Sequence, residues 1–189
     1  IAGIAYMNVE REGTNHGSLT EQPGKANQTY NKLLPNAGLK YQIDERDQLF
    51  YSLSRNMRIP QNYVLYDKGV GSLDSKPELS WNQELGWRYT GEDSTLAATL
   101  FCMQFKNRQL TSLDSNGDSA DINAGTVINK GLELEWSGKL PHNFNYYTSY
   151  TYTSSKQQDD LTVYSAGKPI VLPTSGKQFA NVPTNMLAA

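Results

Sequence analysis

Carboxylate side chains are the first candidates for chemistry in this sequence. Glu133 and Glu135 lie two positions apart, so they share one face of an extended strand, and Glu84 lies in an earlier segment of similar pattern. Two carboxylates on either side of a substrate are what glycoside hydrolysis requires. The sequence shows no environment suited to a general acid around them, so we favour a polar wall facing water over an enzyme active site.

Residues 114–121 (DSNGDSAD) space their carboxylates somewhat like a calcium-binding loop. The twelfth position of an EF-hand loop holds a bidentate glutamate, whereas the corresponding residue here is Gly125. The pair Asn116 and Gly117 is typical of a turn in a solvated loop. The pattern therefore favours an ordinary loop, with calcium binding as the alternative.

The two histidines and the single cysteine do not form a reactive group. His16 and His142 have no partner at metal-ligand spacing, which indicates solvated turn residues. Cys102 lies in an apolar stretch, where a buried or lipid-facing thiol is expected, and it has no second cysteine with which to pair. We therefore predict no catalytic residue, no metal site and no cofactor.

The composition limits the class of protein that positions these groups. Hydrophobic residues make up only 38% of the 189 residues, and the twelve tyrosines far outnumber the five phenylalanines. Tyrosine suits a surface that is apolar on one side and wet on the other. The net charge is −2 with no run of Lys or Arg, which excludes a nucleic-acid partner. No apolar stretch is long enough for a transmembrane helix, and because the chain begins at Ile1 without a signal-peptide pattern, we expect it to be cut from a longer protein.

Alternation of apolar and polar residues predicts an all-β protein. In the clearest segment, Trp81 and Leu85 share one face of a strand, whereas Glu84 and Arg88 share the other. Segment 95–106 has apolar residues on both faces, so its pattern gives no orientation. The expected strands are 1–8, 37–43, 47–55, 80–90, 95–106, 127–137, 143–154 and 182–189.

The connections between these strands alternate in length. Short connections are expected at 44–46, 91–94 and 138–142, and long polar ones at 9–36, 56–79, 107–126 and 155–181. In an up-and-down meander every second connection lies on the same side, so all the long loops would lie at one end of the sheet. Outer-membrane barrels have this asymmetry, with short periplasmic turns and long outer loops.

Aromatic residues fall at two levels of the predicted sheet. The set beside the short turns comprises Tyr41, Phe50, Tyr51, Trp87, Tyr89, Trp136, Phe144 and Tyr146, and the set nearer the long loops comprises Trp81, Phe105, Tyr150 and Tyr152. Trp81 and Tyr89 would be about 26 Å apart along a strand, or about 19 Å vertically at a tilt near 45°. This is close to the height of the apolar band of a membrane barrel. The lumen-facing residues would then be Glu84, Arg88, Glu133 and Glu135.

Four blocks of the sequence, taken in order, resemble the TonB-dependent outer-membrane transporters. They are 34–41 leading into 48–60, the Lys-Pro-Glu to Gly-Trp-Arg-Tyr stretch at 76–89, the Phe-Lys-Asn-Arg of 105–108, and 123–125 followed by 130–135. The ordered series is specific and spans essentially the whole chain. The resemblance implies an antiparallel up-and-down transmembrane β-barrel, of which residues 1–189 supply about eight strands out of twenty-two. We expect the plug domain, the TonB box and the C-terminal strand to lie outside this chain.

The resemblance also implies a function, namely TonB-dependent active transport of a scarce nutrient across the bacterial outer membrane. A ferric siderophore or a ferric citrate-type chelate is the first choice of ligand. The implied partners are the TonB energy-transducing system, acting through the plug, and the lipid of the outer membrane. Guanidinium groups pair with carboxylates and aromatic rings stack on flat ligands. The candidate ligand contacts at the outer mouth are Arg55, Arg58, Tyr63, Tyr66 and Tyr164, and loop packing or membrane anchoring is the alternative for each.

Two other classes stay open at this point. A secreted β-sandwich carbohydrate-binding module would stack its aromatic rows on sugar rings, although long loops at one end fit it less well. An enzyme built around Glu84 and Glu133 would need a nucleophile or metal motif, which the sequence lacks.

Overall fold

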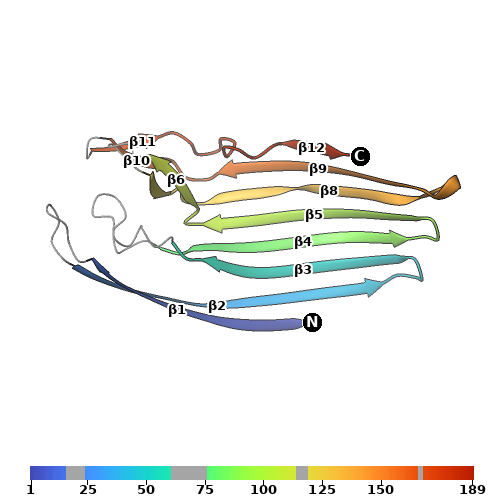
Figure 1. Ribbon diagram of the computed structural model, residues 1–189, viewed down its shortest axis with the longest axis horizontal. Coiled ribbons are helices and arrows are strands. Elements are labelled where there is room, and N and C mark those ends of the chain that lie inside the picture. The colour runs from blue at the N-terminus through green and yellow to red at the C-terminus, as the bar shows by residue number, and fades with distance from the viewer. Residues whose placement is uncertain (16–23, 61–75, 114–118, 166–167) are drawn as a thin grey trace.

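The computed structural model describes residues 1–15, 24–60, 76–113, 119–165 and 168–189. Eight of its strands form one antiparallel sheet in the order β1-β2-β3-β4-β5-β8-β9-β12, with β1 and β12 as open edges (Figure 1). Their bounds are β1 (Ala2–Asn15), β2 (Gly24–Gln42), β3 (Asp47–Arg58), β4 (Glu78–Thr90), β5 (Ser94–Lys106), β8 (Val127–Leu140), β9 (Phe144–Gln157) and β12 (Asn185–Ala188). The hairpins β6 (Gln109–Leu113) with β7 (Ser119–Asn123) and β10 (Leu161–Ser165) with β11 (Lys168–Leu172) are separate, and the 3-10 turn η2 (Pro141–Asn143) precedes β9. The predicted all-β antiparallel fold is confirmed, and no helix in the described ranges is long and apolar enough to cross a membrane.

Pairing across the sheet gives it two chemically different faces. Leu85 pairs with Leu100, which pairs with Leu132. Because paired residues point to the same side, this row belongs to one face, which we call the apolar face. One residue further along β5, Thr99 pairs with Glu133, and this row belongs to the opposite side, which we call the polar face.

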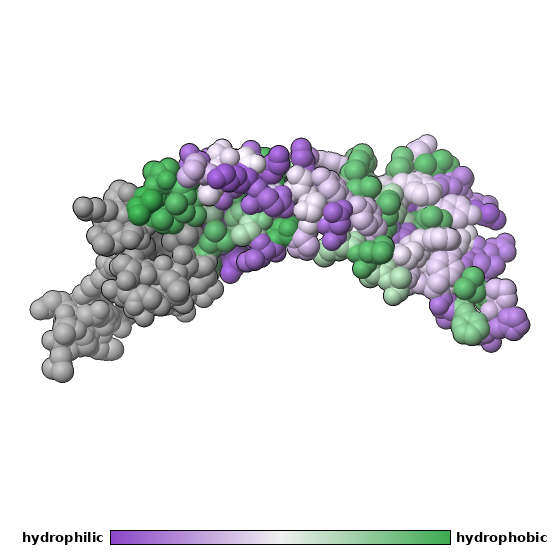
Figure 2. All heavy atoms as spheres, turned by 90° about the horizontal axis from the view of Figure 1, so that it is seen from above, coloured by the Kyte–Doolittle hydropathy of each residue, from purple (hydrophilic) through white to green (hydrophobic). Residues whose placement is uncertain are grey.

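The apolar face is uncovered. Leu39, Leu85 and Leu100 are 69%, 52% and 56% exposed. Other large exposed side chains on this face are Ile4, Tyr6, Leu33, Tyr41, Leu49, Leu134, Trp136, Tyr152 and Leu187. Viewed from the β12 edge, the sheet is bent into an arch (Figure 2). A sheet in a soluble sandwich would bury such a row against a second layer, so a continuous exposed row of this size marks a surface that contacts something other than water.

Three of the predicted long loops contain regular structure. Segment 9–36 is largely a continuation of the β1–β2 hairpin, 107–126 contains β6 and β7, and 155–181 contains β10 and β11. The predicted connections were therefore too long, because these polar segments show no apolar alternation and their backbone pairing cannot be recognised from that pattern. Pairing of β2 with β3 begins at Asn36, next to Pro35, which suits a strand edge because proline has no N–H.

The pairing of β5 supplies the orientation that its sequence pattern lacked. Cys102 lies on the apolar face, and Phe101 lies on the polar face. A Cβ atom at Gly131 would lie 2.7 Å from Cζ of Phe101, and one at Gly86 would lie 2.2 Å from Cζ of Phe50. The two glycines therefore leave room for aromatic rings of neighbouring strands. Phe50, expected among the aromatic residues beside the short turns, lies on the polar face.

Aromatic side chains on the apolar face gather beside the short turns. Trp87 donates a hydrogen bond from Nε1 to Oδ1 of Asp47 at 2.7 Å and stacks on Tyr89 with ring centroids 6.3 Å apart. Trp136 and Tyr146 meet edge to face at 5.1 Å. These contacts hold amphipathic rings at one level, as in the interface girdle of a membrane barrel.

The short turns are held by local hydrogen bonds. Oδ1 of Asp44 accepts hydrogen bonds from the backbone N–H groups of Arg46, at 2.8 Å, and Asp47, at 2.9 Å. These bonds, followed by the nearby Arg46 charge, hold the pKa of Asp44 below its usual value. His142 and Asn143 adopt left-handed backbone angles, with φ of 66° and 63°, in the turn between β8 and β9. His142 is exposed, as expected for a turn residue.

A bulge of three extra residues precedes the last strand, β12. Lys156 of β9 pairs with Gln178, whereas Tyr152 pairs with Asn185, so a step of four residues on β9 is matched by seven on the returning chain. Asn181 lies within these extra residues and has a φ of 60°. Because the number of extra residues is odd, the bulge reverses which alternate residues face each side.

A small apolar cluster lies on the polar face at the end where the long connections emerge, which we call the loop end. Phe179, which the bulge leaves facing this side, packs with Ala124 and Val127, and all three are buried. Gln157 donates a hydrogen bond from Nε2 to the carbonyl oxygen of Ala124 at 3.0 Å. The cluster ties the segment after β11 to the end of the sheet.

Candidate functional site

A hollow on the polar face brings together four charged side chains from two strands. Its volume is about 200 Å³, and its lining comprises Phe50, Glu84, Arg88, Ala97, Thr99, Glu133 and Glu135. The guanidinium carbon of Arg88 lies 4.6 Å from the ring centroid of Phe50, and Ser52 donates a hydrogen bond to Oε2 of Glu84 at 3.2 Å. Three carboxylates face one guanidinium, so the hollow carries an excess of negative charge.

Alternation and small residues position this hollow. Ala97 pairs with Glu135 and Thr99 pairs with Glu133, so the short side chains of β5 lie beside the long acidic ones of β8. Gly86 lies between Glu84 and Arg88 along β4. The polar face therefore has space above β5, and the charged groups of β4 and β8 border that space from opposite sides.

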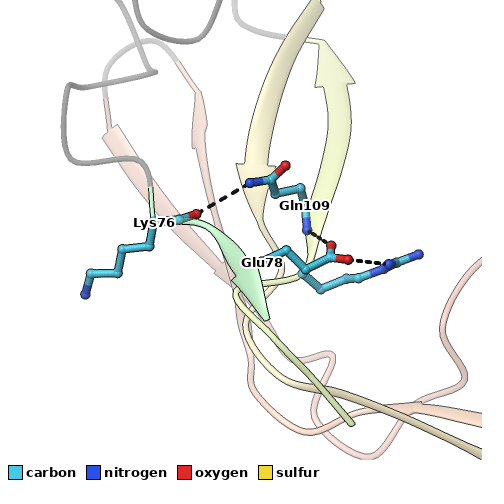
Figure 3. A network of polar contacts seen from close by, with 4 residues as sticks. Lys76, Glu78 and Gln109 are labelled. Carbon is cyan, nitrogen blue, oxygen red and sulfur yellow. Dashed lines mark hydrogen bonds and ion pairs between the residues drawn. The ribbon is translucent and has the colours of Figure 1, made fainter. Parts of the chain in front are cut away.

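A buried carboxylate holds the bases of two long connections at the loop end. Oε1 of Glu78 accepts a hydrogen bond and ion pair from Nη1 of Arg108 at 2.8 Å, and its Oε2 accepts a hydrogen bond from the backbone N–H of Gln109 at 3.0 Å (Figure 3). Gln109 also donates a hydrogen bond to the carbonyl oxygen of Lys76 at 3.4 Å. Glu78 is only 5% exposed, and Arg108 lies 4.5 Å from the ring centroid of Phe105.

The expected ligand contacts do not all lie on one side. Arg58 pairs with Glu78 on the polar face and is exposed at the loop end. Arg55 pairs with Trp81, and its guanidinium carbon lies 5.5 Å from the centroid of that ring on the apolar face. This position suits an anchor at the membrane interface, because an arginine stacks on an aromatic ring there.

The tyrosines in the expected ligand set cannot be compared in the same way. Tyr63 and Tyr66 lie outside the described residues. Tyr164 lies in β10, where its backbone pairs with Pro169, and its side chain is outside the described part of the structure. Of the five expected contacts, Arg58 is the one whose side chain is described on the polar face.

The sequence reasoning missed two groups at the loop end. Glu78 was part of the family-like Lys-Pro-Glu block, but its partner Arg108 lies 30 positions away, and no local spacing links them. Arg11 donates a hydrogen bond to the carbonyl oxygen of Pro60 and lies near the buried Tyr30. Burial raises the pKa of Tyr30, and the charge of Arg11 opposes this effect. A search for basic and aromatic residues within segment 9–36 would have found Arg11 and Tyr30.

The described residues contain no group of three His, Cys, Asp or Glu side chains arranged to hold a metal ion. Positions 114–118 of the calcium-like segment lie outside the described ranges. Gly125, at the twelfth position of that pattern, has a φ of 75°, and an added Cβ atom would lie 2.6 Å from the carboxylate of Asp159. That carboxylate accepts a hydrogen bond from the backbone N–H of Thr126 at 2.6 Å, so Gly125 serves a tight backbone approach.

Comparison with known proteins decides the family. The sequence profile described as "TonB dependent receptor-like, beta-barrel" matches residues 1–189, the whole chain. The chain belongs to this family. The TonB-dependent receptor barrels are outer-membrane proteins of Gram-negative bacteria, and the location predicted for this chain is confirmed.

Relatives within this family carry the names of receptors. The chain is 25% identical over 181 residues to a pesticin receptor of Yersinia enterocolitica, which covers 92% of the chain and 26% of the relative. It is 28% identical over 131 residues to a ferric-pyoverdine receptor of Pseudomonas putida, which covers 66% of the chain and 15% of the relative. The structure of the siderophore receptor PiuA from Acinetobacter baumannii matches 98% of the chain and 27% of its own length, at a TM-score of 0.78 and 18% identity.

These comparisons fix the fold and leave the ligand open. The chain spans about a quarter of the length of the pesticin receptor and of PiuA. The relatives are named as receptors and transporters, which supports a protein that is not an enzyme.

Proposed function

We propose that this TonB-dependent receptor segment is part of the wall of a barrel that imports a ferric siderophore or a ferric citrate-type chelate. A single sheet with an uncovered apolar face and a charged, hollowed polar face supports the barrel wall, and the ferric-pyoverdine receptor among the relatives supports the class of ligand. Such a sheet needs lipid on one side and water on the other, which a closed barrel provides. The polar face then faces the lumen, and the loop end faces outward.

Ligand capture is assigned to the loop end of the lumen wall. The guanidinium of Arg58 is exposed there and points to the same side as the polar hollow, so it is available to pair with a carboxylate of an anionic chelate. Tyr63, Tyr66 and Tyr164 remain proposed contacts, because aromatic rings stack on flat ligands.

The acidic hollow has a different proposed role. Glu84, Glu133 and Glu135 outnumber Arg88, so the hollow repels an anionic chelate and attracts cationic protein groups. We assign these cationic groups to the plug domain, through which the TonB system would act. The excess negative charge of the lumen wall supports this assignment.

Arg55 and Arg58 offer a matched test of ligand capture. They lie three positions apart on β3 but on opposite faces. In a strain lacking the chromosomal gene, the full-length parent carrying Arg58→Gln should grow poorly on the single iron source that the wild type uses, whereas Arg55→Gln should grow normally. Equal growth of both variants on every ferric chelate tested would contradict the assigned role of Arg58.

Growth of the deletion strain on single iron sources tests the wider proposal. Loss of growth on one ferric chelate, restored by the wild-type gene, is the expected result. A full-length parent that is soluble and monomeric without detergent would instead favour the carbohydrate-binding sandwich, which the uncovered apolar face argues against.

A further inference from the structure

On strands β3, β4, β5, β8 and β9, charged side chains separate between the two faces of the sheet. The carboxylates on β4 and β8, namely Glu78, Glu84, Glu133 and Glu135, all lie on the polar face. The apolar face carries Arg55, Lys106, Lys130 and Lys156 instead, which we call the loop-end cations. Their pairing partners on this face are Trp81, Leu79, Cys102 and Ile128, respectively.

The loop-end cations border the apolar rows. Lys130 lies two positions from Leu132 on the same face, a separation of about 7 Å along the strand. Lys106, Lys130 and Lys156 are exposed, while Arg55 is half-buried over a tryptophan ring. Long cationic side chains in this position keep their stems against apolar surface and extend their charges toward the polar layer of a membrane.

Within the described part of β3, β4, β5, β8 and β9, these charges have no carboxylate on their own face at the loop end, and the loop-end carboxylates that share this side, Glu10 and Glu12, lie on β1. From Leu53 to the strand ends, the apolar face of β3, β4, β5, β8 and β9 holds no carboxylate. The one ion pair within the described ranges joins Arg108 to Glu78 on the polar face. At the turn end the pattern reverses, because the apolar face there carries Asp47 and none of the Lys or Arg residues of these strands.

We propose that the loop-end cations bind phosphate groups of lipids in the membrane leaflet at the loop end. At the loop end of these strands, four cations without a carboxylate complement an anionic surface, and both ammonium and guanidinium groups donate hydrogen bonds to phosphate oxygens. The absence of cations at the turn end makes the interaction specific to one leaflet. The inference rests on the membrane placement of the family and is independent of the ligand that the barrel carries.

The test uses the purified full-length parent protein in detergent, with lipid adducts counted by native mass spectrometry. Phosphatidic acid is the probe, diacylglycerol with the same chains is the control without phosphate, and inorganic phosphate is the control without a lipid. The test variant is Lys130→Gln/Lys156→Gln. The matched variant is Lys40→Gln/Lys139→Gln, which removes two lysines from the polar face of the same sheet.

We expect Lys130→Gln/Lys156→Gln to weaken phosphatidic acid binding by roughly fivefold for each cation removed. The matched variant should bind as the wild type does, and Lys130→Arg/Lys156→Arg should retain binding. Diacylglycerol should show little binding to any of them. An equal loss in both double variants, equal binding of diacylglycerol, or equal binding of inorganic phosphate alone would overturn the proposal. Iron uptake by the same variants is a separate readout, so failure of the transport proposal would be distinguishable.

Discussion

The carboxylate of Glu78 gives the sharpest prediction, because it is the one deeply buried charge in the described ion pair. We expect Glu78→Ala to loosen the bases of the two connections that flank β4 and β6. The substitution removes the partner of Arg108 and leaves the backbone N–H of Gln109 without its acceptor. The strands themselves should persist, since their ladders do not involve this side chain.

The structure bounds the size of this effect. Removing one partner of a fully buried ion pair costs about 3–5 kcal/mol. The side chain of Arg108 is 29% exposed, so water partly replaces the lost carboxylate and reduces the cost. The lost charge-assisted hydrogen bond from the backbone N–H of Gln109 adds to the reduced cost of the broken ion pair. We therefore expect Glu78→Ala to cost about 2 kcal/mol of local stability. Glu78→Gln should cost about 1 kcal/mol, because it keeps an acceptor oxygen.

Hydrogen exchange on the full-length protein in lipid measures this local cost. A cost of about 2 kcal/mol corresponds to roughly thirtyfold faster exchange of the backbone amides of Arg108, Gln109 and Ala124, which bond within the affected region. The control is Glu84→Gln, because that carboxylate accepts a single weak hydrogen bond from Ser52. Unchanged exchange in the Glu78→Ala protein, or equal acceleration throughout the sheet, would refute the reasoning.

Three further predictions concern the faces, the packing and the turns of the sheet. Leu100→Lys should cost about 2–4 kcal/mol when the full-length protein folds into vesicles from urea, whereas Thr99→Lys on the polar face should cost about 0.5 kcal/mol or less. Gly131→Ala should cost about 1–3 kcal/mol in that assay, because its Cβ atom would lie 1.9 Å from a carbonyl oxygen; Gly38→Ala, with 3.9 Å to its nearest atom, should be nearly neutral. The pKa of Asp44 is lowered by hydrogen bonds to its charged form, so its contribution to turn stability should be present above the ordinary carboxyl pKa and lost as the pH falls through the lowered value. An NMR titration of that carboxyl should give an apparent pKa below the value for a free aspartate.

Each of these predictions has an outcome that contradicts it. Equal costs for Leu100→Lys and Thr99→Lys would mean that the two faces do not differ in environment. A neutral Gly131→Ala would show that the aromatic ring and the neighbouring strand yield without strain. An unshifted titration of Asp44 would show that its turn hydrogen bonds do not favour the ionised form.

The sequence predicted the strands that have lipid on one side and water on the other. Where one side of a strand meets lipid and the other meets water, side chains must alternate, as Leu85 and Glu84 do. The membrane-crossing strands were therefore found with errors of a few residues at their ends. The extension of the β1–β2 hairpin was missed because its mostly polar sequence shows no alternation of apolar and polar residues.

The candidate site was likewise predicted only in part from the sequence. Alternation by itself determined that Glu84, Arg88, Glu133 and Glu135 lie on the charged side of their strands, because parity along one strand is a local property. The predicted meander already placed segment 127–137 beside 95–106, but only the tertiary structure decided the register, in which Glu133 pairs with Thr99 and Glu135 with Ala97, so that the four residues reach one hollow. Strand pairing is a long-range choice, and no period within one segment encodes it.

The arginines at the loop end show the limit most clearly. The sequence placed Arg55 and Arg58 where a strand meets a long loop, and the structure extends that strand to Arg58, which puts the two side chains on opposite faces. Only the structure showed that the Arg55 side chain lies over the ring of Trp81 and that Glu78 forms an ion pair with Arg108. The physical reason is that periodicity along a strand sets the direction of a side chain, whereas its partner depends on the register between strands that are distant in the sequence.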